Sequence, residues 1–220
     1  MTLALLSGGM DSTTLLAHTA AEAALFIDYG QRHIREHRSA RQVADHYHIP
    51  LYEVNLREFG SAVRSALTSG DMAVPHGHYA ADNMAITVVP NRNAVLLSVA
   101  AGICASRGLG RVVIAVHAGD HAVYPDCRPE FITALSAATR LGCGVTIDAP
   151  FSHYTKTDIA VLAGRLGVPL ELTWSCYEGG ELHCGRCGTC VERAEAIHAA
   201  GLLDPTRYAD PSFWRAAVGT

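Results

Sequence analysis

"LLSGGMDSTTLLA", residues 5–17, joins a short apolar strand to a helical pattern through two adjacent glycines. Glycine lets the backbone turn sharply and approach a ligand closely. The helix that follows presents free N–H groups and partial positive charge at its start, which favours an anion there. Ser7, Ser12 and Thr13 add hydroxyl donors. The stretch predicts a phosphate-binding loop, although a tight turn capped by Asp11 or Ser12 would give the same pattern.

The rest of the chain alternates apolar, β-rich runs with helical patterns. We expect strands at 2–7, 23–28, 51–56, 111–116 and 145–150, and helices at 11–23, 35–47, 93–106, 128–141 and 156–167. In the third helix, the spacing puts Leu96, Val99, Ala100 and Ile103 on one face, and Gly142 should end the fourth. This alternation predicts an α/β fold with a doubly wound parallel sheet and a ligand site beyond the carboxyl ends of its strands.

The irregular stretch at about 57–90 is expected to be an excursion over that ligand site. We therefore divide the chain into a phosphate-binding α/β domain, residues 1–170, and a C-terminal segment, residues 171–220, packed on it. The net charge of −4 gives no reason to expect a nucleic-acid or membrane surface. Apolar runs stay short of the roughly 20 residues that span a bilayer. With no leader pattern at its start, the chain is expected to be soluble and cytoplasmic.

Four of the seven cysteines crowd together in a C-x7-C-x2-C-x2-C pattern, at Cys176, Cys184, Cys187 and Cys190. Four thiolates suit a closed, structural Zn2+ site, and an iron–sulfur cluster is the alternative. His183 is a possible substitute ligand, but next to Cys184 it is expected to point away. The remaining three, Cys104, Cys127 and Cys143, are interpreted as small apolar residues.

The order SGGMDS at residues 7–12 lacks the lysine of the common nucleoside-triphosphatase loop. It resembles instead the pyrophosphate loop (PP-loop) of ATP pyrophosphatases, SGGxDS. This resemblance implies that ATP is cleaved between its α- and β-phosphates, with AMP rather than ADP as product. It implies that ATP is bound by Leu6, Ser7, Gly8, Gly9, Met10, Asp11, Ser12, Thr13, Thr14, Leu15 and Leu16, with Mg2+ near Asp11.

Four further stretches, "DYGQRH" at 28–33, "VPNRN" at 89–93, "YPDCRPEF" at 124–131 and "ELTWSCYEGGELHCGRCGTCVER" at 171–193, resemble the 7-cyano-7-deazaguanine synthase (QueC) family. The resemblance runs nearly end to end. The chain departs from the family pattern at Asn91, where glycine is more frequent, and at His117 and Gly119, where the family has an asparagine and an acid.

The resemblance implies roles for residues outside the loop. Lys156, at the start of the last predicted helix, would face the phosphates, although a lysine there is usually a solvated charge. Arg92 would bind a phosphate or carboxylate with its guanidinium fork. Tyr124, Asp126 and Arg128 would contact the substrate, unless the last two pair with each other and fix their loop. Gln31, Arg32 and His33 would lie near the adenosine, although His33 could equally be a structural cap.

The implied reaction converts 7-carboxy-7-deazaguanine and ammonia to a nitrile through an adenylated acid and an adenylated amide. A relative that stops at the amide, or couples the activated acid to another amine, is the alternative enzyme. A zinc-stabilised nucleotide-binding module without catalysis is the third reading. The family also implies a homodimer without direct nucleic-acid contact, and zinc as a structural metal beside ATP and Mg2+.

Overall fold

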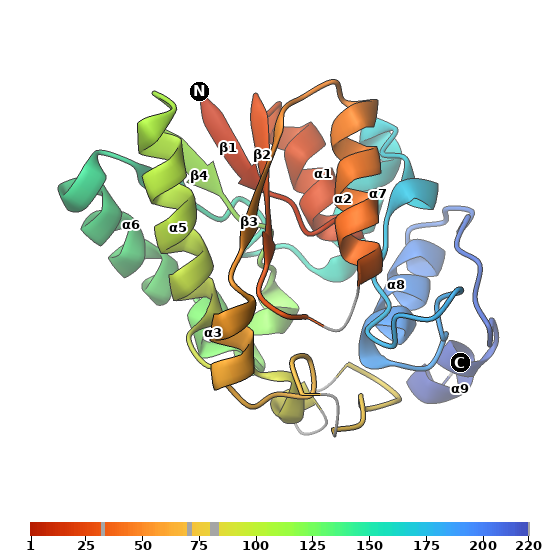
Figure 1. Ribbon diagram of the computed structural model, residues 1–220. Helices are drawn as coiled ribbons and strands as arrows, with labels where there is room; N and C mark the ends of the chain where they lie inside the picture. Colours follow the sequence, from red (N-terminus) through yellow and green to blue (C-terminus); the bar gives the residue numbers. More distant parts are fainter. Residues whose placement is uncertain (32–33, 70–71, 80–83, 220) are drawn as a thin grey trace.

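The computed structural model describes residues 1–31, 34–69, 72–79 and 84–219 (Figure 1). Five strands form one parallel sheet in the order β3-β2-β1-β4-β5. They are β1 (Thr2–Leu5), β2 (Ala23–Asp28), β3 (Leu51–Asn55), β4 (Arg111–Val113) and β5 (Thr146–Asp148). In the register of the sheet, Ala4 lies between Ala24 of β2 and Val113 of β4. The order reverses at β1, so the loop after β1 leaves the sheet at its switch point.

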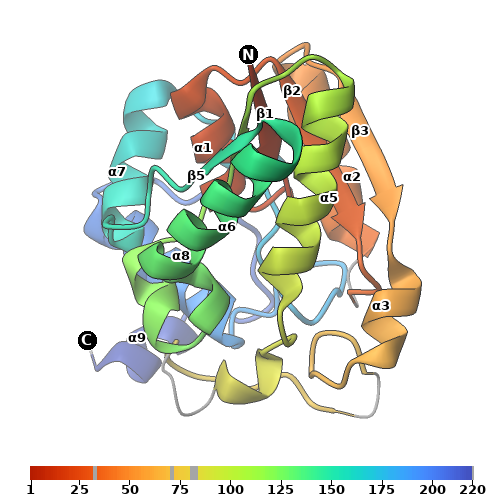
Figure 2. The ribbon, with the colours of Figure 1, turned by 90° about the vertical axis from the view of Figure 1, so that its left-hand side faces the viewer.

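Helices cover both faces of the sheet (Figures 1 and 2). On one face, α1 (Met10–Thr19), α2 (Ile34–His46) and α7 (Lys156–Leu166) bury Leu15, Val43 and Ile159 against the strands. On the other face, α5 (Arg92–Ser106) and α6 (Pro129–Cys143) bury Leu97 and Ile132. The doubly wound α/β architecture predicted from the sequence is therefore confirmed.

Short elements and the C-terminal segment complete the described chain. The short ones are α3 (Arg57–Ala62), η1 (Ala85–Thr87), η2 (Ala118–Ala122), η3 (Pro125–Cys127) and η4 (Leu170–Leu172), followed by α8 (Gly188–Ala199) and α9 (Phe213–Val218). In α8, Ala196 and Ile197 share a buried cluster with Met10 of α1. Trp214 of α9 packs on Val191 of α8. The segment after 170 thus packs directly on the α/β part, whereas its status as a separate domain stays a prediction.

Several predicted boundaries are wrong. The first helix ends at Thr19 because Ala20 takes a left-handed conformation, with φ 46°. The fourth helix continues to Cys143 and is ended by Gly144, at φ 75°, rather than by Gly142. In α5 the fully buried face is one residue on from the predicted one, at Leu97, Ala100, Ala101 and Cys104. This helix is apolar on most sides, so periodicity alone does not select its inner face.

Residues 85–106 are long and apolar enough, by composition, to cross a membrane. The structure divides them, because a non-helical segment separates η1 from α5 and Asn91 has a left-handed φ of 58°. Helix α5 alone has 15 residues, about 22 Å of length, which is short of a bilayer core of about 30 Å. Its inner side packs in the main core. We conclude that α5 is a core helix.

Candidate active site

A cavity of about 250 Å3 opens beyond the carboxyl ends of β1, β2 and β4. Polar groups from segments far apart in the sequence line it, as expected at the switch point of an open parallel sheet. They include Ser7, Asp11, Ser12, Glu36, Arg92, Asp120, Tyr124, Lys156 and Thr189. Asp11, Arg92 and Lys156, which are far apart in the sequence, therefore meet at one place.

The glycine loop is tightly enclosed between β1 and α1. Gly8 has φ 84°, and a Cβ there would lie 2.6 Å from the backbone nitrogen of Ala40. Its carbonyl accepts hydrogen bonds from the Trp174 N–H at 2.8 Å and the Ser39 hydroxyl at 2.9 Å. Only glycine fits this position, because both the conformation and the space exclude a side chain.

Apart from Gly8, the residues predicted to bind ATP divide into two groups. Leu6, Ser7, Gly9, Met10, Asp11 and Ser12 line the cavity. Thr13, Thr14, Leu15 and Leu16 are buried beneath it in helix α1 and the core. The first group can contact a ligand directly, whereas the second can support the loop.

Lys156, at the first position of α7, is held between two carboxylates. Its Nζ lies 2.6 Å from Oδ2 of Asp11 and 3.0 Å from Oε2 of Glu192. Burial would lower the pKa of Lys156, but the neighbouring carboxylates outweigh burial and raise it above its usual value. A cation is normally disfavoured at the start of a helix, but here the carboxylates of Asp11 and Glu192 stabilise the Lys156 ammonium.

The Asp11 side chain pairs with Lys156 and also lines the cavity. Burial would raise its pKa, but the Lys156 ammonium outweighs burial and holds the Asp11 pKa below its usual value. Asp11 does not cap α1, because Gly9 precedes the helix and the Asp11 Oδ2 pairs with Lys156. Its other oxygen, Oδ1, is buried and has no hydrogen-bond partner among the described residues.

The His117 side chain is buried among three carboxylates, those of Asp11, Asp120 and Glu192. Its Nδ1 accepts a hydrogen bond from the Gly119 N–H at 3.1 Å, which leaves the proton of the neutral ring on Nε2. That Nε2 faces three carboxylates, at 3.6 Å from Asp120, 3.7 Å from Glu192 and 4.0 Å from Asp11. A Cβ at Gly119 would lie 2.9 Å from the His117 ring. Two of the three departures from the family pattern, His117 and Gly119, are therefore in direct contact.

The opposite part of the cavity combines an arginine, an acid and aromatic rings. The guanidinium carbon of Arg92 lies 5.9 Å from the ring centroid of Tyr29 and 5.8 Å from that of Tyr124. Burial raises the pKa of Glu36 to about 7, although Arg92 acts to lower it. This arrangement suits a flat, polar ligand with an anionic group.

Other predicted contacts lie elsewhere. Asp126 does not line the cavity, because its carboxylate accepts from the Asn93 N–H at 2.8 Å and so fixes the start of α5. Arg128 is exposed and donates to the carbonyl of His121. Their substrate contacts stay a prediction. Gln31 lines the cavity, whereas Arg32 and His33 lie outside the described residues.

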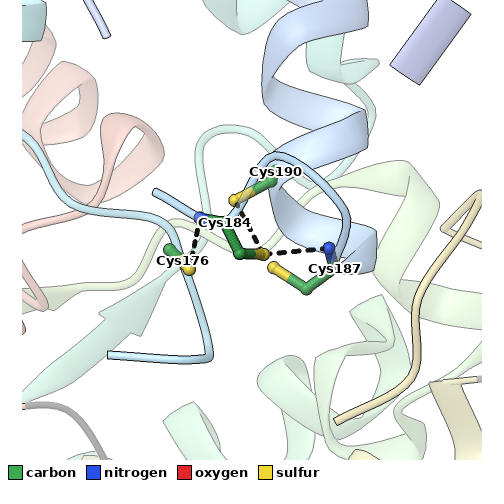
Figure 3. A group of neighbouring side chains, drawn as sticks. All are labelled: Cys176, Cys184, Cys187 and Cys190. Carbon is green, nitrogen blue, oxygen red and sulfur yellow. Dashed lines mark hydrogen bonds between the residues drawn. The ribbon is translucent and has the colours of Figure 1, made fainter. Parts of the chain in front are cut away.

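The four cysteines of the C-terminal pattern converge (Figure 3). All four Sγ atoms lie within 4.8 Å of one another. Tetrahedral zinc with Zn–S bonds of about 2.3 Å requires sulfurs about 3.8 Å apart, and the Sγ atoms of Cys184 and Cys190 are 3.9 Å apart. Backbone N–H groups also donate to sulfurs, as at Cys176 and Cys184. The donor set fits a closed metal site.

His183 is not part of this group. Its Nε2 accepts from the Ser175 N–H at 3.1 Å, and its ring packs 4.1 Å from that of Trp174. Burial lowers the His183 pKa to about 3, so the ring is neutral. The expectation that His183 points away from the cysteines agrees with this geometry.

The sequence assigned no role to four residues of the site: Tyr29, Glu36, His117 and Glu192. His117 was noticed only as a departure from a pattern. Glu192 follows Cys190 by two residues, and this closeness to the metal pattern was the one available signal.

Three comparisons with known proteins agree. A family model described as "Queuosine biosynthesis protein QueC" matches residues 1–201. The 7-cyano-7-deazaguanine synthase of Ruegeria pomeroyi is 48% identical over 225 positions, covering 99% of this chain and 98% of that protein. The synthase of the same name from Brucella anthropi is 45% identical over 225 positions, covering 99% and 97%. NMN synthetase from Francisella tularensis shares the fold, with a TM-score of 0.50, 15% identity and coverage of 98% and 83%.

Proposed function

The chain belongs to the QueC family of queuosine biosynthesis proteins, and from that premise we propose that ATP and 7-carboxy-7-deazaguanine react in the cavity described above. The activity is that of a 7-cyano-7-deazaguanine synthase. One observation carries the assignment to this cavity. Lys156 meets Asp11 of the glycine loop beside the free helix start, where a pyrophosphate group would be bound.

The glycine loop and Lys156 form the end of the site that would bind the phosphates. The N–H groups at the start of α1 and the hydroxyls of Ser7 and Ser12 can bind the pyrophosphate of ATP. Lys156 supplies the fixed positive charge that the glycine loop lacks, and it neutralises charge on the departing pyrophosphate. Asp11, with its free buried Oδ1, fits as a ligand for Mg2+, which would supply further charge neutralisation.

Two rounds of activation account for the nitrile. The substrate carboxylate attacks the α-phosphorus of ATP, giving an acyl adenylate and pyrophosphate. Ammonia attacks the acyl carbon, and AMP leaves with the formation of an amide. The amide oxygen then attacks the α-phosphorus of a second ATP and displaces a second pyrophosphate, and loss of AMP and two protons from the adenylated amide gives the nitrile. Both rounds activate an oxygen on the same carbon, so one site can serve both.

Arg92 and the aromatic rings fit the base end of the site. The Arg92 fork can bind the substrate carboxylate or the ring carbonyl, while Tyr29 and Tyr124 flank the flat heterocycle. Glu36, on the same cavity wall, can accept hydrogen bonds from the amidine-like edge of the base when it is ionised. These groups replace Asp126 and Arg128 as the strongest candidates for substrate recognition.

The four-cysteine centre supports the site without entering the reaction. Its four positions are filled by protein sulfur, so it leaves no open coordination position for substrate or water, as is typical of structural zinc. A homodimer and a cytoplasmic location are also proposed, from the family. Light scattering of the purified protein tests the first.

A product assay tests the proposal. The purified protein is incubated with ATP, ammonium and 7-carboxy-7-deazaguanine, and products are followed by mass spectrometry. We expect the nitrile and two AMP for each substrate consumed. Accumulated amide with one AMP would identify the alternative ligase, and ADP in place of AMP would overturn the assignment of the loop.

A further inference from the structure

Lys156 is the single lysine in the chain of 220 residues; the other 16 of the 17 basic residues are arginines. Its two partners come from different parts of the fold. Asp11 belongs to α1 and the glycine loop, whereas Glu192 belongs to α8, beyond the cysteines. The side chains of Lys156 and Glu192 are only 16% and 12% exposed. A flexible side chain is thus restrained from two sides.

A bound nucleotide would affect the two ion pairs of Lys156 differently. Asp11 lines the cavity, and under the proposed function its carboxylate faces phosphate and Mg2+. Glu192 does not line the cavity, so no ligand there competes for it. When Asp11 engages the ligand, Glu192 is the partner that can still hold Lys156.

The position of Glu192 follows from the cysteine centre. Cys187 immediately precedes α8, and its carbonyl accepts from the N–H groups of Cys190 and Val191 at 2.9 and 3.0 Å. Glu192 is therefore in the first turns of a helix whose start carries two of the four sulfurs (Figure 3). At Gly188, a Cβ would lie 2.8 Å from the sulfur of Met84, so the helix start is also closely packed.

Both oxygens of Glu192 have neighbours. Oε2 lies 3.0 Å from Lys156 Nζ, and Oε1 lies 3.7 Å from His117 Nε2. A Cβ at Gly119 would lie 2.9 Å from the His117 ring, so the absence of a side chain there leaves room for the imidazole that faces Oε1. The carboxylate is therefore oriented as well as placed.

We propose that Glu192 is a positioning residue that keeps Lys156 directed at the phosphate site, and that the four-cysteine centre influences catalysis through it. The proposal rests on the proposed function for its catalytic consequence. The restraint on Lys156 itself is a property of the ion pair and can be measured without turnover.

The single lysine makes the measurement direct. An amine-reactive acylating reagent can modify only Lys156 and the N-terminus, and peptide mass spectrometry separates the two. The variant is Glu192→Gln, which keeps the size of the side chain and removes its charge. The matched control is Glu195→Gln on the same helix, whose side chain is 42% exposed and lies 3.9 Å from His78.

We expect Glu192→Gln to bind zinc like the wild type, to be acylated at Lys156 about tenfold faster, and to lose about tenfold to a hundredfold in kcat. Glu195→Gln should match the wild type in all three. Glu192→Asp, which keeps the charge but shortens the reach, should be intermediate. If Glu192→Gln folds, binds zinc and behaves like Glu195→Gln, Glu192 has no positioning role.

A second measurement tests the link to the metal. Removing zinc with a chelator should accelerate Lys156 acylation in the wild type but not further in Glu192→Gln, with circular dichroism confirming that both stay folded. Equal acceleration in both proteins, or unfolding of both, would overturn the link. If the acylation results hold but no nitrile forms, the proposed function fails while the positioning role of Glu192 stands.

Discussion

Lys156 and Asp11, 145 residues apart in the sequence, meet with Nζ 2.6 Å from Oδ2. The pair joins the glycine loop after β1 to the start of α7. A loop without its own lysine therefore receives a cation from the start of α7, which packs with α1 on the same face of the sheet.

Replacing this lysine should abolish turnover while leaving the fold intact. Lys156→Met keeps the length of the side chain and removes the charge, and we expect kcat for AMP formation to fall by about 10²–10³. Zinc content and circular dichroism should be unchanged. Turnover within a factor of three of the wild type would contradict a role for Lys156 at the phosphates.

Arg92 and Arg128 can be compared directly as substrate ligands. Because Arg92 lines the cavity and Arg128 is exposed, Arg92→Gln should raise KM for 7-carboxy-7-deazaguanine at least tenfold, about 1.4 kcal/mol of binding free energy, and Arg128→Gln should not. Steady-state kinetics at saturating ATP gives both values. The reverse ranking would restore the role that the sequence assigned to Arg128.

Glu36 should make stability depend on pH near neutrality. Burial raises its pKa from 4.5 to about 7, so between these values the folded protein binds more protons than the unfolded chain. The free energy of unfolding should therefore fall as pH rises from about 4.5 to 7. Glu36→Gln should remove this slope, as measured by thermal unfolding at several pH values. An identical slope in the variant would place its origin elsewhere.

Replacing a cysteine inside the four-cysteine centre and one outside it should have different effects on zinc content and on the melting temperature. Cys187→Ser removes one of the four sulfurs and should lower bound zinc and the melting temperature. Cys143→Ser, an exposed cysteine outside the group, is the control and should change neither. Elemental analysis measures the zinc. Full zinc content in Cys187→Ser would show that the ligand set is wrong.

The backbone conformation at Asn91 explains why the chain can have asparagine where the family more often has glycine. Its φ of 58° lies in the left-handed region, which glycine adopts freely and asparagine tolerates. Asn91→Gly should therefore be nearly neutral, whereas Asn91→Val should destabilise the protein by about 1–2 kcal/mol. Urea denaturation measures both. Equal stability of the valine variant would exclude backbone strain at this position.

Local patterns predicted the parts of the protein that depend on neighbours in sequence. The glycine loop and the four-cysteine pattern each lie within one segment, and each strand or helix of the alternation was predicted from its own residues. Glu192 and His117 escaped prediction because their roles come from contacts between α8, η2 and α7, which no spacing encodes. The inner face of α5 escaped for another reason, since nearly all its positions are apolar. Asp126 shows that an acid beside a strand end can fix a helix start as well as bind a ligand, which a sequence pattern does not distinguish.

The arginine-rich composition has a chemical consequence. Arginine resists acylation near neutral pH, so an acetyl donor that would mark many surface sites on a lysine-rich enzyme finds one ε-amine here, at Lys156. Acetylation of that amine would remove the charge that faces the phosphates. For this protein, the extent of lysine acetylation and the fraction of inactive enzyme would be the same quantity.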